Sequence, residues 1–290
     1  MATTTTNFLI GSHLPVNRIG LGTMRLTDAP GHNPAAAPIW TAPTDTENAT
    51  TVLRTAVDLG VNLIDTADSY ALGDSETFIA DALHPYREGL VLATKVGVAR
   101  PSPAEWIPLG RPEYLRQQAE LSLRRLKVER LDLLQLHRVD PTVPLEDQIG
   151  ALKQLVDEGK AAHIGLSEVG VEELEKARAI TPIATVQNWY NLSHRDHEDV
   201  VDYAEKHGIA FIPFFPIAAG AATREEGPIA DIAKELNVTR AQVALAWLLK
   251  RSPAIIPIPG TRDVKHLKDN IEAQNIDLTD DQFKRLEADA

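Results

Sequence analysis

Short, almost wholly apolar runs alternate with longer amphipathic segments along nearly the whole chain. Runs such as LVLATK and LDLLQLH place apolar side chains on both faces of a strand, which is typical of a parallel sheet covered by helices. The predicted strands are 18–21, 62–65, 90–95, 131–137, 162–167, 185–188, 210–214 and 255–259. The predicted helices are 46–59, 75–83, 111–126, 145–158, 172–179, 197–207, 239–251 and 264–273.

Local signals support these helices. Pro112 stands just inside one helix start, Gly60 follows another helix, and Thr239 with Gln242 forms a capping-box pattern. Eight strands alternating with eight helices predict a single α/β domain over residues 1–290, a (β/α)8 TIM barrel. Residues 228–236 and 279–288 are two extra helices, and residues 7–17 are expected to form a short N-terminal hairpin that closes the barrel floor.

A doubly wound open sheet is the alternative fold. It is disfavoured because no G-x-G-x-x-G follows an early strand, and Gly20-Leu21-Gly22 lacks the third glycine and an immediate helix. A dinucleotide, if bound, must therefore be held in another way.

Composition narrows the function classes. The net charge of −12 disfavours binding to nucleic acid or to an anionic membrane. Without cysteine, disulfides and thiol catalysis are excluded. Residues 194–198 (HRDHE) superficially resemble metal ligands, but acidic residues at a helix start are explained by the helix dipole, so no metal is expected. No signal peptide or membrane span is found, which makes the cytoplasm the expected location.

Four ionisable residues fall at or just after the ends of three successive predicted strands. Asp65, Lys95 and His137 end these strands, and Tyr70 follows Asp65 by five residues. Because the carboxyl ends of barrel strands meet at one face, these residues should surround one mouth. Each residue alone would more often be structural, but the joint occurrence points to a catalytic site.

This set suits reduction of a carbonyl group. A carbonyl that receives a hydride develops negative charge on oxygen and needs a proton donor, which Tyr70 could be. The positive charge of Lys95 should lower the pKa of that phenol. At 4 Å and an effective dielectric constant of about 20, one unit charge contributes about 4 kcal/mol before the cost of desolvation is counted. Asp65 could hold Lys95 charged, and His137 could donate a hydrogen bond to the substrate oxygen.

Several ordered motifs now point to one family. Residues 61–70 (VNLIDTADSY) with 73–76 (GDSE), 93–95 (ATK), 131–137 (LDLLQLH), 159–167, 186–191 (VQNWYN) and 256–261 (IPIPGT) resemble the aldo-keto reductases over residues 19–286. The resemblance implies an oxidoreductase whose catalytic tetrad is Asp65, Tyr70, Lys95 and His137, with Tyr70 as general acid and base.

The resemblance also implies a site for a nicotinamide dinucleotide. The implied cofactor residues are Gly22, Thr23, Met24, Ser167, Gln187, Phe214, Thr261, Arg262, His266, Asp269 and Asn270. Arg262, with His266, could pair with a 2′-phosphate, which favours NADPH over NADH. Glu168 and Phe215 depart from the family pattern, where Asn and a small residue are common, so residues 218–221 are expected to supply contacts near the pyrophosphate.

The substrate is expected to be a small aldehyde, ketone or alcohol. Residues 211–216 and Asn270 resemble a microbial branch that includes pyridoxal reductases, which suggests a planar aromatic aldehyde such as pyridoxal. The pocket candidates are Met24, Trp40, Trp106, Arg138 and Trp189, and the long loop at residues 27–44 is a candidate lid.

Two other functions stay open. One is a redox-sensing regulatory subunit on the same fold, similar to the potassium-channel β-subunits, which would bind NADPH and turn over poorly. The other is an unrelated barrel hydrolase or isomerase that would not bind NADPH. The preferred direction of reaction and the oligomeric state are not indicated by the sequence.

Overall fold

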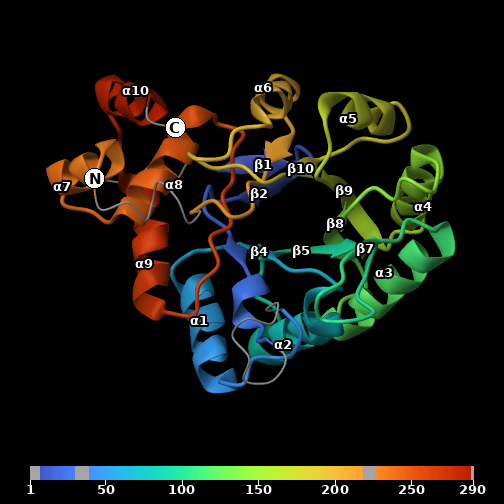
Figure 1. Ribbon diagram of the computed structural model, residues 1–290. Coiled ribbons are helices and arrows are strands. Elements are labelled where there is room, and N and C mark those ends of the chain that lie inside the picture. Colours follow the sequence, from blue (N-terminus) through green and yellow to red (C-terminus); the bar gives the residue numbers. More distant parts are fainter. Residues whose placement is uncertain (1–6, 30–38, 218–225, 289–290) are drawn as a thin grey trace.

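The computed structural model describes residues 7–29, 39–217 and 226–288 (Figure 1). Its centre is a sheet of seven strands in the order β11-β10-β9-β8-β5-β4-β3, with all neighbours parallel. The strands are β3 (Leu21–Gly22), β4 (Leu63–Asp65), β5 (Val91–Val96), β8 (Leu131–Leu136), β9 (Ala161–Ser167), β10 (Thr185–Gln187) and β11 (Ala210–Phe211).

Helices surround this sheet (Figure 1). They are α1 (Thr46–Asp58), α2 (Asp74–Leu83), α3 (Pro112–Leu126), α4 (Leu145–Asp157), α5 (Val171–Arg178), α6 (Glu198–His207), α7 (Pro228–Leu236), α8 (Arg240–Arg251), α9 (Val264–Glu272) and α10 (Asp280–Ala288). Every predicted helix is confirmed, with each end within one residue of its prediction. None of the helices in the described part of the chain is long and apolar enough to cross a membrane.

The predicted eighth strand at 255–259 is not a regular strand. Ile255 makes a single parallel bridge to Phe211, and the backbone N–H of Gly20 donates to Pro257 O at 3.0 Å. The segment therefore joins both edges of the sheet, although Pro257 and Pro259 have no N–H to continue a ladder. Proline has the same effect in β11, which ends at Phe211, before Pro213, instead of reaching residue 214 as predicted.

Two short hairpins flank the sheet. The predicted N-terminal hairpin is present as β1 (Phe8–Ile10) and β2 (Leu14–Val16), which pair antiparallel. A second hairpin, β6 (Val98–Ala99) with β7 (Ile107–Pro108), lies inside the loop after β5 and was not predicted. Short 3₁₀ turns complete the secondary structure at η1 (Met24–Leu26), η2 (Tyr70–Gly73) and η4 (Ala273–Asn275).

Alternate residues of each strand face different cores. Leu63, Val91 and Leu133 join Ile10 and Val16 of the hairpin in a small apolar cluster, whereas the intervening strand residues pack into the larger cluster with the helices. Because the side-chain period of a strand is two, the residues two and four positions further along face the same side as the small cluster. Four of these positions carry polar side chains: Asp65, Lys95, Gln135 and His137.

A close backbone approach holds the 258–260 segment against β3. A Cβ atom on Gly22 would lie 2.8 Å from the carbonyl oxygen of Ile258, and one on Gly260 would lie 2.7 Å from that of Gly22. Both distances are below any normal carbon–oxygen contact, so glycine is required at both positions if the segment is to stay in place.

We therefore expect Gly22→Ala to lower the free energy of unfolding by about 1–3 kcal/mol, since the added methyl group must push two backbones apart. Gly150→Ala is the matched control, because a Cβ on Gly150 within α4 meets nothing within 4 Å. This control should be neutral or stabilising by about 0.5–1 kcal/mol. Urea unfolding of both variants measures the difference, and equal behaviour would contradict the close-approach argument.

Candidate active site

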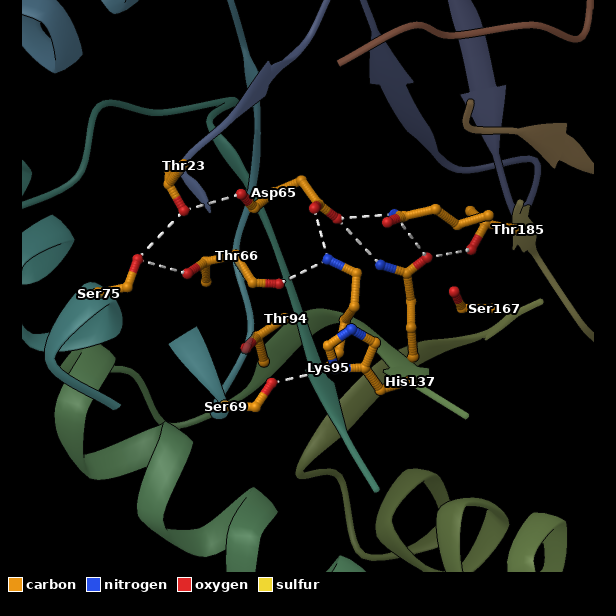
Figure 2. Close-up of polar contacts among 12 residues, drawn as sticks. Thr23, Asp65, Thr66, Ser69, Ser75, Thr94, Lys95, His137, Ser167 and Thr185 are labelled. Atoms are coloured by element: carbon orange, nitrogen blue, oxygen red, sulfur yellow. Dashed lines mark hydrogen bonds and ion pairs between the residues drawn. The ribbon is translucent and has the colours of Figure 1, made fainter. Parts of the chain in front are cut away.

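A buried ion pair lies at the carboxyl ends of β4 and β5. Lys95 Nζ donates to Asp65 Oδ1 at 2.5 Å and to the carbonyl oxygen of Thr66 at 2.8 Å, and both charged side chains are almost fully buried (Figure 2). Burial lowers the pKa of Lys95, but the charge of Asp65 and hydrogen bonds outweigh it, so the pKa lies above its ordinary value. The lysine is therefore a permanent cation.

The second oxygen of Asp65 is held by two amides. Oδ2 accepts from Gln135 Nε2 at 3.1 Å and from Gln187 Nε2 at 2.9 Å, and Gln135 Oε1 accepts in turn from the Thr185 hydroxyl at 3.3 Å (Figure 2). Side chains from three other strands, β5, β8 and β10, thus fix the carboxylate. Gln135 was not among the predicted site residues, although its place two residues before His137 on one strand face was a usable signal.

Tyr70 opens the η2 turn that follows β4. Its ring centroid lies 5.2 Å from Lys95 Nζ and 5.9 Å from the His137 ring. Burial raises the pKa of Tyr70, the charge of Lys95 lowers it, and the net pKa lies above its ordinary value. Lys95 therefore acts in the predicted direction, but desolvation of the phenolate, which that prediction left uncounted, is larger.

His137 directly follows β8 and is buried. Its Nδ1 lies 3.1 Å from the Ser69 hydroxyl (Figure 2). Burial lowers the pKa of His137 well below its ordinary value, and the charges of Lys95, Arg138 and Arg100 act in the same direction. The ring is therefore neutral, and a Ser69 hydroxyl that donates to Nδ1 leaves the ring proton on Nε2.

One large cleft joins these residues to α9. Its volume is about 1320 Å³, and Asp65, Tyr70 and His137 line one end of it, while Lys95 lies behind them. The predicted cofactor residues that line the cleft are Gly22, Met24, Ser167, Gln187, Phe214, Thr261, Arg262, His266, Asp269 and Asn270. Residues that are distant in the sequence thus line the same cavity.

Comparison with known proteins agrees with this geometry. The Aldo/keto reductase family model matches residues 18–289.

The chain belongs to the aldo/keto reductase family.

Similar proteins support the assignment over almost the whole chain. An uncharacterized oxidoreductase of Schizosaccharomyces pombe is 43% identical over 94% of this chain and 86% of its own length. The pyridoxine 4-dehydrogenase of Escherichia coli is 38% identical over 94% of each chain. An aldo-keto reductase of Klebsiella pneumoniae, solved in complex with NADPH, is 27% identical, with a TM-score of 0.80 over 99% of this chain and 95% of that chain.

Besides Lys95, three of the predicted residues lie outside the cleft lining. Thr23 is buried, and its hydroxyl donates to the carbonyl oxygen of Asp65 at 3.0 Å. Trp189 is 40% exposed and stacks on His194 at 4.0 Å. Trp40 lies 5.5 Å from the Arg100 guanidinium. Of the other pocket candidates, Met24, Trp106 and Arg138 line the cleft of this reductase.

Arg262 is engaged with the chain itself. Its Nη2 forms an ion pair with Asp28 Oδ1, and its Nε donates to the carbonyl oxygen of Arg25 at 2.5 Å. Asp28 also accepts from the Thr44 amide at 2.6 Å, at the base of the 27–44 loop. Residues 30–38 of this predicted lid lie outside the described residues.

The two departures from the family pattern have definite placements. Glu168 has a left-handed backbone (φ 57°), and its Oε1 accepts from the Trp189 amide at 2.7 Å. Phe215 is also left-handed (φ 49°), 40% exposed and part of the cleft lining. Residues 218–221, which were expected to replace the missing pyrophosphate contact, lie outside the described part of the chain.

Arg100 is a site residue that the sequence did not reveal. Its guanidinium stacks on Trp106 at 3.6 Å, and it donates to the carbonyl oxygens of Ser69 at 3.3 Å and Pro103 at 2.8 Å. It thereby fixes Trp106, whose ring centroid lies 6.4 Å from that of Tyr70 and 6.1 Å from that of His137. No sequence signal marks such a residue, because its partners are backbone carbonyls and an indole ring from different loops.

In the described ranges, no group of three or more His, Asp or Glu residues is placed to hold a metal ion. His194 instead stacks on Trp189 and lies 3.7 Å from Asp196.

The neutral state of His137 predicts a pH effect on stability. The unfolded chain binds a proton at this residue below about pH 6.5, whereas the folded protein does not, so stability is lost as the pH falls below that value, by up to about 1.4 kcal/mol per pH unit. Between pH 7.5 and 5.5, His137→Gln should therefore lose about 1 kcal/mol less than the parent in urea unfolding. Equal losses would show that His137 is protonated in the folded protein.

Proposed function

We propose that this aldo-keto reductase transfers a hydride from NADPH to a small aldehyde or ketone, with Tyr70 as the proton donor. The observation that carries the proposal is the buried Lys95–Asp65 pair beside Tyr70 and His137 at one end of the cleft. This arrangement suits a substrate oxygen that gains negative charge during reaction.

The cleft suits a dinucleotide in size and lining. Ser167, Gln187 and Phe214 lie near the tetrad, where they would hold the nicotinamide, and Thr261, Arg262, His266, Asp269 and Asn270 lie around α9, where they would hold the adenosine end. NADPH, when bound, supplies the hydride. The NADPH complex of the Klebsiella reductase supports this choice of cofactor.

The protein residues would handle the proton. Tyr70 is a neutral phenol, and its proton moves to the substrate oxygen as the hydride reaches the carbonyl carbon. The phenolate left behind is stabilised by the adjacent Lys95 ammonium, which Asp65 holds in place. His137, being neutral, would orient the carbonyl by donating a hydrogen bond. Tyr70 recovers its proton from water after product release.

Pyridoxal is the first substrate that we propose to test. The Escherichia coli relative is a pyridoxine 4-dehydrogenase, and Trp106, Val98 and Pro108 give the catalytic end of the cleft flat apolar walls that suit an aromatic ring. The test is loss of absorbance at 340 nm with an aldehyde panel that includes pyridoxal. Tight NADPH binding without turnover of any carbonyl would instead favour a redox-sensing regulatory subunit, and absence of NADPH binding would favour an unrelated hydrolase or isomerase.

Tyr70→Phe should abolish reduction, by about 10²-fold or more, because no other phenol lines the cleft among the described residues. NADPH affinity, measured by fluorescence quenching, should change by less than about twofold, since the ring remains. If most of the activity survives, the proton comes from another group.

Arg262→Ala should weaken NADPH binding by about tenfold while changing NADH binding little, because only NADPH carries a 2′-phosphate for the guanidinium. Asp28→Asn is the matched control, since it breaks the same ion pair but keeps the arginine. If both variants lose NADPH affinity equally, the loss comes from breaking the Arg262–Asp28 ion pair and not from a lost contact with the 2′-phosphate.

A further inference from the structure

Arg138 lies at the border between the catalytic residues and the proposed nicotinamide residues. It follows His137 in the chain and lines the cleft. Its Nη1 donates to the His137 carbonyl oxygen at 2.6 Å and to the Ser167 hydroxyl at 3.1 Å, and its guanidinium carbon lies 5.8 Å from the Phe214 ring centroid. All of its hydrogen bonds to described residues use Nη1. One full edge of the guanidinium, formed by Nε and Nη2, therefore has no hydrogen-bond partner in that part of the chain.

No acidic side chain neutralises this group. Among the described residues, no carboxylate lies within 4.0 Å of the Arg138 guanidinium nitrogens. Glu168 is the carboxylate whose charge acts on Arg138, but its Oε1 is turned to the Trp189 amide. Burial lowers the pKa of Arg138, which reflects the cost of holding an uncompensated cation away from water.

A second cation strengthens the local positive potential. Arg100 is buried, and all its hydrogen bonds to described residues go to backbone carbonyls. Lys95 adds no net charge because Asp65 pairs with it. Two guanidinium groups without a carboxylate partner among the described residues therefore lie in this region of a protein whose net charge is −12: Arg138 lines the cleft, and Arg100 stacks on Trp106, which also lines it.

We propose that Arg138 is a substrate-binding residue that selects carbonyl compounds carrying a carboxylate or another acidic oxygen. The inference rests on the proposed function, because it assigns a substrate class to the same site. The free Nε–Nη2 edge has the geometry that binds both oxygens of a carboxylate, which a lysine could not match. The aromatic and apolar walls of the cleft would hold the rest of the substrate.

The test uses two aldehydes that differ mainly in charge: 4-carboxybenzaldehyde and methyl 4-formylbenzoate. Steady-state kinetics with NADPH compare the parent protein with Arg138→Gln, Arg138→Lys and Arg87→Gln. Arg87 lies before β5, at the opposite end of the strand from Lys95, and its side chain is 59% exposed, so Arg87→Gln makes the same charge change far from the site.

The parent should prefer the acid over the ester by about tenfold or more in kcat/KM. Arg138→Gln should reduce the ratio to about one, mainly through a higher KM for the acid. Arg138→Lys should be intermediate, and Arg87→Gln should resemble the parent. A ratio near one in the parent, or an equal loss for both aldehydes in Arg138→Gln, overturns the inference.

Calorimetric titration separates this inference from the proposed function. 4-(Hydroxymethyl)benzoate should bind the parent at least about tenfold more tightly than its methyl ester and should lose this advantage in Arg138→Gln. Turnover of the ester without any preference for the acid would contradict the proposed role of Arg138 and would still support carbonyl reduction. Preferential binding of the acid without turnover of either aldehyde would support the anion site at Arg138 and contradict the proposed reductase activity.

Discussion

A lysine ammonium group taken fully out of water needs a fixed carboxylate, and the Lys95–Asp65 pair is the contact on which the rest of the site depends. Breaking such a pair on one side typically costs about 3–5 kcal/mol, because the remaining charge stays buried. Asp65 is in turn held by Gln135 and Gln187, so neighbouring strands must keep their register for the pair to exist. The small apolar cluster with Ile10 and Val16 lies on the same strand face nearer the strand starts. The packing of the sheet and the Lys95–Asp65 pair therefore both depend on the same strand register.

This constraint explains the state of Tyr70. A cation at 5.2 Å from the ring favours the phenolate, but burial disfavours it more, so the phenol keeps its proton. A donor of this kind releases its proton only when new negative charge appears beside it. His137 is held neutral by the same burial and by the same cations. In the mechanism that we propose, both groups would therefore respond to charge on a substrate oxygen rather than to bulk pH.

The sequence predicted the parts of the structure that rest on local signals or on simple periodicity. Helix α8 was predicted because Thr239 and Gln242 form a capping box, and the structure contains both of its hydrogen bonds. The carboxyl ends of parallel strands share one face, so Asp65 and His137 could be placed at one mouth without knowing the loops. Burial could not be predicted in this way, so the predicted effect of Lys95 on the pKa of Tyr70 left out the larger opposing effect of desolvation. Trp40 and Trp189, which were pocket candidates, are not part of the cleft lining for a related reason: loop side chains contact whichever partner lies near, here Arg100 and His194.

Arg262 and Arg138, which both line the cleft, differ in whether a carboxylate of the described chain pairs with them. Arg262 already has a carboxylate partner in Asp28, so a 2′-phosphate that binds there replaces one anion with another, and the net gain is only the difference between two ion pairs. Arg138 has no such partner among the described residues, so an anion that reaches its free edge relieves an existing desolvation cost and meets no competitor. Equal charge on a ligand is therefore worth more at the catalytic end of the cleft than at the adenosine end. If both proposals hold, the charge on a carbonyl compound should therefore meet less competition from the chain at Arg138 than the 2′-phosphate of a dinucleotide meets at Arg262.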